Sequence, residues 1–208
     1  MPSPHSPAAQ PSLRERKRER TRRALIDVGA ELFDRQGYDE TTVAEIAAAA
    51  EIGTRTFFTY FASKEDLLFP ESDARARTTL AAIAERKPSD GPVDILLRAL
   101  DAVAESDTDM VSPMAAVRTR LFRTVPAVRG KALQVQMDAQ QDIARALSAA
   151  FPESLDRVTA AALAGAFTGA VAGAVMALLD AGAEAGDAEA HRALIRQATE
   201  VALAPWRR

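Results

Sequence analysis

One short segment of the sequence combines clustered aromatic side chains with groups that can donate hydrogen bonds. Residues 52–68 read IGTRTFFTYFASKEDLL and hold three phenylalanines and a tyrosine, although aromatic residues make up only 5% of the chain. Arg55 and three threonines lie among them. Guanidinium, hydroxyl and phenol groups are donors that contact phosphates and base edges in nucleic acids. The segment therefore favours DNA recognition as a first hypothesis.

The sequence offers few residues that could carry catalysis or hold a metal. It contains two histidines, His5 and His191, and no cysteine. Zinc-protease, nucleophile-elbow, phosphate-loop and Glu-x-x-His patterns do not occur. We therefore predict no catalytic residue, no metal site and no cofactor, and the lack of cysteine fits a reducing cytoplasm. A helical enzyme or carrier with a vestigial N-terminal domain is kept as an alternative.

The pattern of apolar residues and breaks predicts helices throughout the 208 residues. Gly37 is a stop signal, Thr42 and Glu45 form a capping-box pattern, and no alternation of strand length is found. We expect helices over residues 14–36, 42–50, 54–61, 63–86 (broken at Pro70), 93–105, 112–124, 127–150, 154–182 and 187–204. The predicted fold class is all-α, with a three-helix N-terminal domain and a larger helical body.

The helix expected over residues 54–61 has two different faces. At about 100° per residue, its phenylalanines Phe57, Phe58 and Phe61 fall on one side. The other side carries the possible DNA contacts Arg55, Thr56, Thr59 and Tyr60. A preceding short helix and a four-residue turn complete a helix-turn-helix pattern. A helical hairpin that only packs against the core is the alternative.

The order of residues around this segment resembles a known family. TTVAEIAAAAEIGTRTFFTYFASKEDLL (residues 41–68), preceded by LFDRQGY (residues 32–38), is similar to the DNA-binding domain of TetR-type transcriptional regulators. The resemblance covers about residues 20–69 and rests on the capping threonine, the T-x-x-x-Y-F pattern and the S-K-E-x-L-L run. The stretch RTFFTYFASKED is also similar to a subset of actinobacterial regulators.

The resemblance implies roles for individual residues. Thr42 and Lys64, each near a helix start, are expected to contact phosphates. A phosphate would also explain a lysine in a first turn, where the helix dipole favours anions. The residues implied to face the major groove are Thr54, Arg55, Thr56, Thr59 and Tyr60. Two positions depart from the family pattern: Phe58 is usually Tyr, which has a phosphate-binding hydroxyl, and Glu51 is usually Gly.

A basic run precedes these helices, although the whole chain has a formal net charge of −3. LRERKRERTRR (residues 13–23) holds seven basic and two acidic residues, a local charge of +5. Such a run standing alone is more often a solvated helix face. Because the resemblance places it where the family's N-terminal arm follows the DNA backbone, we expect phosphate contacts from Arg20 and Arg22.

Three glycines in the C-terminal half predict a close helix contact. They recur every four residues, and a glycine inside a helix costs about 1 kcal/mol unless a contact compensates. The resemblance implies that the last two long helices form a four-helix interface between two subunits. The expected interface residues are Gly165, Gly169, Gly173, Met176, Leu194 and Val201. Packing of the glycines within one subunit is the alternative.

The helix that carries these glycines could be mistaken for a membrane span. Residues 158–179 contain no charged side chain over 22 positions. They are mostly Ala and Gly, so their tendency to enter hydrocarbon is weak, and we expect a helix buried in a protein interface. No membrane partner is predicted.

Apolar residues in the middle of the chain predict a core, and the resemblance implies a ligand cavity within it. The expected lining is Phe69, Leu100, Val103, Met114, Val117, Arg118, Leu121 and Met137. The ligand is expected to be an apolar or amphipathic small molecule of unknown identity. Arg118, Arg120 and Arg123 could meet an anionic group on it, but a solvated helix face is the simpler explanation.

Taken with the resemblance, the sequence predicts a disordered tail (residues 1–12), a helix-turn-helix DNA-binding domain (13–69) and a ligand-binding and dimerisation domain (70–208). The predicted function is cytoplasmic, sequence-specific transcriptional regulation. The expected form is a homodimeric repressor that a small molecule releases from a palindromic operator on double-stranded DNA. The alternative is a DNA-binding activator or scaffold that needs no inducer.

Overall fold

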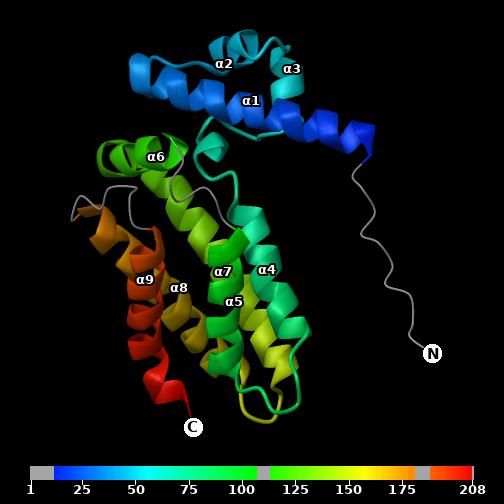
Figure 1. Cartoon of the computed structure of the whole chain (residues 1–208), viewed down its shortest axis with the longest axis vertical. Helices are drawn as coiled ribbons and strands as arrows, with labels where there is room; N and C mark the ends of the chain where they lie inside the picture. Colours follow the sequence, from blue (N-terminus) through cyan, green and yellow to red (C-terminus); the bar gives the residue numbers. More distant parts are fainter. Residues whose placement is uncertain (1–11, 107–112, 181–187, 208) are drawn as a thin grey trace. The chain divides into compact units, whose positions relative to one another are not determined.

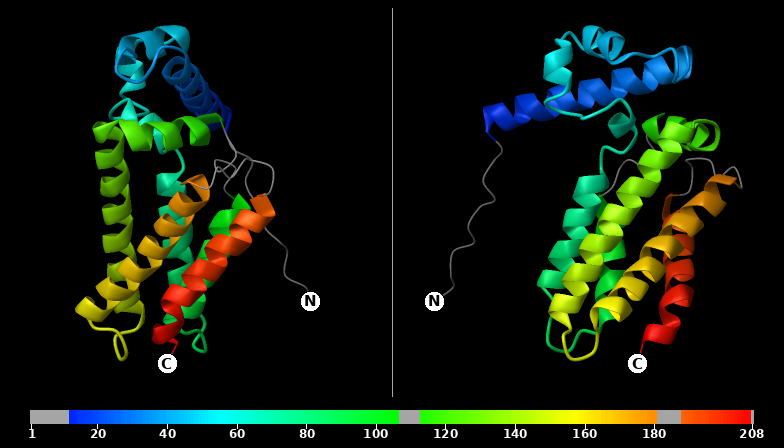
Figure 2. Two further views of the ribbon diagram at one scale, coloured as in Figure 1. Left: turned by 90° about the vertical axis from the view of Figure 1, so that its left-hand side faces the viewer. Right: turned by 180° about the vertical axis from the view of Figure 1, so that it is seen from behind.

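The computed structural model describes residues 12–106, 113–180 and 188–207, and the regular structure in these residues is helical. The predicted all-α class is confirmed. The chain separates into two compact units, with the division between Leu67 and Leu68. Figure 1 labels the helices of both units, and Figure 2 shows them from two further sides. Residues 1–11 of the expected tail lie outside the described residues.

The N-terminal unit begins with a long helix, α1 (Leu13–Arg35). Ser12 caps this helix: its hydroxyl oxygen accepts from the Glu15 N–H at 3.2 Å, and its own N–H donates to the Glu15 carboxylate at 2.6 Å. The helix ends at Gln36, and Gly37 follows with a φ of +89°, a left-handed conformation that glycine adopts without strain. The stop predicted from Gly37 is confirmed.

Two short helices follow α1. The first, α2 (Val43–Ala49), carries the predicted capping box between Thr42 and Glu45. The second, α3 (Thr54–Phe57), is shorter than the helix predicted over residues 54–61. Beyond α3 the backbone continues in tighter turns, because the N–H groups of residues 59 and 60 donate to carbonyls three residues back instead of four.

The segment after α3 breaks where the proline predicted a break. The short 3₁₀ helix η1 (Glu65–Leu68) ends before Pro70, and α4 (Ser72–Ala84) begins after it. Proline has no N–H to donate, so a continuous helix would lose a hydrogen bond at this position. The prediction of a restart at Pro70 is confirmed.

The core of the N-terminal unit contains large side chains from α1, α2, α3 and η1. They are all at most 1% exposed: Leu25, Phe33, Ile46, Phe57 and Leu67. Gly29 on α1 lets this helix come close to Leu67, because a Cβ at Gly29 would lie 2.8 Å from Leu67 Cδ1. These contacts fix the orientation of α3 through its buried side.

The C-terminal unit contains six α-helices in its described residues. After α4 they are α5 (Pro92–Ser106), α6 (Pro113–Thr124), α7 (Pro126–Ala150), α8 (Arg157–Asp180) and α9 (Ala188–Leu203), followed by the short 3₁₀ helix η3 (Ala204–Trp206). Helix α8 packs against both α7 and α9, and α4 packs against α5 and α7 (Figure 2). The fully buried side chains of this core include Leu96, Leu147, Leu163 and Leu203.

Helix α8 is apolar, yet most of it is not covered by its own unit. Only 17% of its most apolar window, within Arg157–Leu178, is buried. It is the one helix among the described residues that is long and apolar enough to cross a membrane, and length and composition alone are weak evidence for a span.

Candidate nucleic-acid interface

The α3 segment separates buried aromatic rings from exposed polar groups. Phe57 is fully buried, Phe61 is 6% exposed, and their ring centroids lie 5.9 Å apart. The predicted DNA contacts lie at the surface: Thr54, Arg55, Thr56 and Thr59 are exposed, and Tyr60 is half-buried. The predicted two-faced arrangement is confirmed for these residues.

Phe58 is an exception to this arrangement, and its predicted place on the buried side is wrong. Its side chain is 54% exposed. Its backbone is still helical, since the Phe58 N–H donates to the Thr54 carbonyl, but at 100° per residue Phe58 lies 100° from Phe57, at the edge of the buried side. The Phe58 ring meets the Phe57 ring edge to face, with centroids 5.4 Å apart. An exposed phenyl group on this surface can touch a thymine methyl, but it offers no hydrogen bond.

The hydroxyl of Thr59 already has a partner within the protein. Its Oγ1 donates to the Thr56 carbonyl oxygen at 2.6 Å. The Thr59 hydroxyl proton is therefore already hydrogen-bonded. DNA could contact only the remaining lone pairs of Oγ1 and the methyl group. Thr59 can accept from a base amino group or touch a thymine methyl, whereas a donation to phosphate would require this hydrogen bond to break.

Thr42 is bound to Glu45 through the capping box. The Thr42 N–H and Oγ1 both donate to Glu45 Oε2 at 2.8 Å, and the Glu45 N–H donates to Thr42 Oγ1 at 3.2 Å. The hydrogen bonds from the Thr42 backbone and side chain hold the pKa of the Glu45 carboxyl below its usual range. A phosphate can take these donors only if the Glu45 side chain moves away. The phosphate contact of Thr42 stays a prediction.

Lys64 binds carbonyl oxygens of the loop between α1 and α2. Its Nζ donates to the carbonyls of Tyr38 at 2.7 Å and Thr41 at 2.9 Å, and it lies 4.0 Å from the centroid of the Tyr38 ring. These contacts give a reason within the protein for a lysine at this position, and the explanation by a phosphate stays a prediction. The ammonium group has three donors, and its phosphate contact stays a prediction.

Tyr38 joins Lys64 in a cluster that connects the two ends of the helix-turn-helix. The Tyr38 hydroxyl donates to the Glu65 carboxylate, and its ring lies 5.5 Å from that of Phe33. Burial, together with this hydrogen bond, raises the pKa of Tyr38 well above its ordinary value. The hydroxyl therefore keeps its proton and holds the loop after α1 to the segment after α3.

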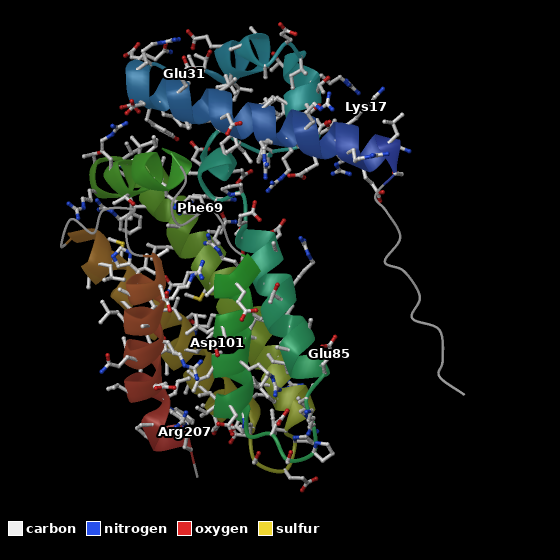
Figure 3. The ribbon with its side chains drawn as sticks, viewed as in Figure 1. Lys17, Glu31, Phe69, Glu85, Asp101 and Arg207 are labelled. Carbon is white, nitrogen blue, oxygen red and sulfur yellow. The ribbon has the colours of Figure 1, made fainter. Side chains whose placement is uncertain are left out.

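The first turns of α1 lie beside the end of the α3 segment. A groove between them is lined by Leu13, Arg14, Lys17, Arg18, Thr21, Thr59 and Tyr60. The Arg18 guanidinium carbon is 6.0 Å from the Tyr60 ring centroid, and that of Arg22 is 5.7 Å from the Phe61 ring centroid, both at cation–π range. Figure 3 labels Lys17 on this part of α1.

The sequence prediction for the basic run named other arginines than those of the groove. Arg22 stacks on Phe61, and Arg20 is not among the groove residues. Helical spacing could have identified the groove residues, because residues 14, 18, 21 and 25 lie on one side of the helix. Leu25 on this side is fully buried, so the same side faces the groove one to three turns earlier.

The residues predicted to line a ligand cavity lie in different environments of the C-terminal unit. Val117 and Leu121 are buried, and Phe69, Leu100 and Val103 are half-buried. The side chain of Met114 lies outside the described part of the chain. The ligand contacts of the buried and half-buried residues stay predictions.

Two of the predicted cavity residues have other surroundings. Met137 is 52% exposed on α7, beside Leu133 at 58%, so its predicted place in an interior cavity is wrong. The Arg118 guanidinium donates to the Leu68 carbonyl oxygen at 3.0 Å, so Arg118 is more than part of a solvated face. An anionic ligand would have to compete with this carbonyl for the same donor.

The three glycines of α8 also differ from one another. A Cβ at Gly165 would lie 3.1 Å from Gln140 Nε2 on α7, so this glycine packs within its own subunit. Gly169 and Gly173 are exposed, and nothing lies within 4 Å of their Cβ positions. On α9, Leu194 is 49% and Val201 is 71% exposed, while Met176 on α8 is half-buried. A subunit interface at these residues stays a prediction.

A family model matches the N-terminal unit. Residues 25–69 match the family described as "Bacterial regulatory proteins, tetR family". The matched residues contain α2, α3 and about half of α1, and so include the helix-turn-helix with its buried Phe57 and exposed Arg55.

Two curated relatives match about half of the chain. The HTH-type transcriptional regulator TcmR of Streptomyces glaucescens is 43% identical over 102 residues, which are 49% of this chain and 45% of TcmR. The HTH-type transcriptional repressor LfrR of Mycolicibacterium smegmatis is 36% identical over 100 residues, which are 48% of this chain and 50% of LfrR. The chain thus matches half or less of the length of these relatives.

A solved structure shares the fold of most of the chain. FadR of Thermus thermophilus, a TetR-family transcriptional repressor in complex with lauroyl-CoA, superimposes with a TM-score of 0.52 and 18% identity. The superposition covers 88% of this chain and 93% of that chain. At this identity the likeness shows the fold alone. The family match and the two relatives show that the N-terminal part of this chain is similar to the corresponding part of TetR-type and other HTH-type transcriptional regulators.

Proposed function

We propose that this chain is a sequence-specific DNA-binding transcriptional regulator that acts in the cytoplasm as a homodimeric repressor. The α3 segment carries the proposal: exposed polar side chains are backed by the buried Phe57, and no acidic residue occurs from Thr54 to Phe61. Such a surface presents hydrogen-bond donors to a polyanion without electrostatic repulsion. The match over residues 25–69 and the names of TcmR and LfrR support the proposal.

Arg55 has the central role in reading the DNA sequence. Its exposed guanidinium can donate two parallel hydrogen bonds to guanine O6 and N7 in the major groove, a contact worth about 1–3 kcal/mol of discrimination. Thr54, Thr56 and Thr59 add methyl contacts and hydrogen-bonding oxygens to this reading surface. The Tyr60 hydroxyl donates to a phosphate next to these base pairs, and Thr42 and Lys64 contact further phosphates of the DNA backbone. The stretch RTFFTYFASKED is similar to a subset of actinobacterial regulators, and we propose that the chain is one of them.

Two copies of the chain pair through α8 and α9. The support is an apolar helix that its own unit leaves mostly uncovered, with open space above Gly169 and Gly173 and exposed Leu194 and Val201 on the neighbouring helix. Another helix could approach closely over the two glycines. A two-fold pair presents two helix-turn-helix units to a palindromic site whose half-sites are one helical turn of DNA, or a multiple of it, apart.

A small molecule in the C-terminal unit controls release from DNA. The support is the shared fold with Thermus FadR, which is described in complex with lauroyl-CoA. The apolar candidates for contact here are Phe69, Leu100, Val103, Val117 and Leu121. A ligand that binds better to a form unable to span both half-sites lowers the population that holds DNA, and the DNA in turn lowers the affinity for the ligand.

Selection of bound fragments from a random pool of double-stranded DNA tests this function. The wild-type chain should enrich an inverted repeat. A variant with Arg55→Ala, Thr56→Ala and Thr59→Ala, which changes only exposed side chains, should remain folded and enrich no common sequence. No enrichment by the folded wild-type chain would contradict DNA recognition, and a single half-site without a repeat would contradict dimeric reading.

A further inference from the structure

The α3 segment leaves one phenyl ring at the surface. The Phe58 side chain is 54% exposed, whereas Phe57 and Phe61 are at most 6% exposed. We infer that Phe58 determines part of the DNA sequence preference, because its ring packs against the C5-methyl group of a thymine close to the base pair that Arg55 reads. The inference rests on the proposed function and deepens it, since it assigns one operator base to an apolar residue.

Helical spacing places Phe58 beside Thr54 and Arg55. The Phe58 N–H donates to the Thr54 carbonyl oxygen at 3.3 Å, so α-helical hydrogen bonding extends from Thr54 to Phe58. Residues three and four positions apart are neighbours on one face of a helix. Thr54 and Arg55 are both exposed. Phe58 therefore shares an exposed face with the arginine that is proposed to bind guanine.

The core of the N-terminal unit supports the exposed ring. Phe58 meets the Phe57 ring edge to face, with centroids 5.4 Å apart and an angle of 85° between the ring planes. This is a favourable geometry for two aromatic rings. The Phe57 ring is fully buried and so provides a fixed support. Because Phe58 already rests on this support, covering it with DNA costs less side-chain entropy than ordering a free side chain.

The chemistry of the Phe58 ring favours a base edge over the DNA backbone. A phenyl group has no N–H or O–H to donate, so it cannot hydrogen-bond to a phosphate oxygen. The base edges in the major groove carry hydrogen-bond donors and acceptors, and the apolar group among them is the C5-methyl of thymine. Contact between the ring and this methyl removes apolar surface of both groups from water, which stabilises the complex.

The spacing between Arg55 and Phe58 limits where the thymine lies. Three residues advance an α-helix by about 4.5 Å. Successive base pairs are about 3.4 Å apart along the DNA axis. The thymine is therefore expected one or two base pairs from the guanine that Arg55 binds.

Removal of single methyl groups from the DNA tests the inference. In the operator selected by the wild-type chain, deoxyuridine replaces one thymine at a time, at the same position of both half-sites. This change removes the C5-methyl and leaves the hydrogen-bonding groups of the base pair unchanged. Affinity for each DNA is measured with the full-length wild-type chain, with Phe58→Ala and with the matched control Thr54→Ser, which removes a protein methyl group from the same face. Circular dichroism verifies that the variants fold.

For the wild-type chain, deoxyuridine at one thymine position should lower the affinity about fourfold in each half-site, or about 15-fold in both. This factor corresponds to about 0.8 kcal/mol for burying one methyl group. Phe58→Ala should bind the thymine and deoxyuridine operators equally at that position. Thr54→Ser should keep the whole difference between them.

Three results would overturn the inference and leave DNA recognition intact. The wild-type chain could bind every deoxyuridine operator as well as the thymine operator. The loss of affinity could persist in Phe58→Ala, or it could disappear in Thr54→Ser, which would assign the methyl contact to the threonine. A wild-type chain that enriches no DNA sequence would instead contradict the proposed function itself.

Discussion

The two compact units present opposite kinds of surface. The N-terminal unit buries most of its large apolar side chains, with Leu13 and Phe58 as exceptions, and exposes threonines, arginines and Lys17 along α1 and the α3 segment. The C-terminal unit leaves apolar residues uncovered along α8 and α9, including Val158 at 79% and Val201 at 71% exposed. A basic polar surface fits a polyanion, whereas an uncovered apolar helix fits another protein surface. In the proposed function, the N-terminal unit therefore binds DNA and the C-terminal unit binds a second copy of the chain.

Glycines show the same contrast at the level of single residues. Gly29 in the N-terminal unit has Leu67 so close that a Cβ would lie 2.8 Å from its Cδ1. Gly169 and Gly173 in the C-terminal unit have nothing within 4 Å of their Cβ positions. The first glycine is explained by packing within the chain, and the other two call for a partner outside it.

The largest effect is expected from the aromatic anchor of α3. Phe57→Ala removes a fully buried ring and should destabilise the N-terminal unit by about 3–5 kcal/mol. Hydrogen exchange should then become faster in α2 and α3 and stay unchanged in α5. The matched control is Phe58→Ala, whose side chain is 54% exposed and whose removal should cost less than about 1 kcal/mol. Equal destabilisation by both variants would contradict the division between the two rings.

A second variant tests whether the open glycines of α8 face another subunit. Gly169→Leu with Gly173→Leu should weaken dimerisation by at least about 2 kcal/mol, roughly 30-fold in the dissociation constant, because the added side chains prevent close approach. Analytical ultracentrifugation measures the change. Gly130→Leu on α7 is the control, since its Cβ position is also open. A dimer unaffected by the α8 variant would place the subunit interface elsewhere.

Lys64→Met tests the structural role of the ammonium group. It removes the hydrogen bonds to the carbonyls of Tyr38 and Thr41 and should reduce the stability of the N-terminal unit by about 2 kcal/mol. Lys17→Met, which changes an exposed lysine of the same unit, should leave stability nearly unchanged. Urea unfolding of the two variants distinguishes the roles. Unchanged stability with weaker DNA binding would show that Lys64 acts as a phosphate contact alone and has no structural role.

The smallest effect concerns the turn between α2 and α3. Glu51 has a φ of +58°, a left-handed conformation that costs a residue other than glycine about 1–2 kcal/mol. Glu51→Gly should therefore stabilise the N-terminal unit by about 0.5–1 kcal/mol after allowance for the flexibility of glycine in the unfolded chain. Glu51→Ala removes the same charge but keeps the strained backbone, so thermal unfolding should show no gain. A gain with alanine would attribute the effect to the carboxylate.

Local patterns predicted the elements well because their causes are local. The capping box of Thr42 and Glu45, the stop at Gly37 and the break at Pro70 each depend on residues within four positions of one another. The buried Phe57 and the exposed Arg55 followed from helical spacing alone. Most of the exposed polar residues of α3 could therefore be predicted from the sequence.

The errors arose where a residue depends on partners distant in the sequence. Lys64 binds carbonyls 23 and 26 positions away, and no local pattern indicates that interaction. Phe58 lies 100° from Phe57 around the helix, at the border between the two faces, where the packing of the other helices decides whether a side chain is covered. Helical spacing from Leu25 could have predicted which side of α1 faces the groove. That Arg14 and Lys17 line the groove depends on the position of Tyr60, which no local pattern gives.

The most direct test of the central claim, that the exposed face of α3 reads base pairs, is the sequence preference of Arg55→Ala. Affinity of the wild-type chain and of the variant is measured for the selected operator and for every single-base change within one half-site. The account predicts that discrimination falls by about 1–3 kcal/mol at one base pair and persists at the others. A uniform loss of affinity over all sequences, with every preference retained, would make Arg55 a backbone contact and contradict the account.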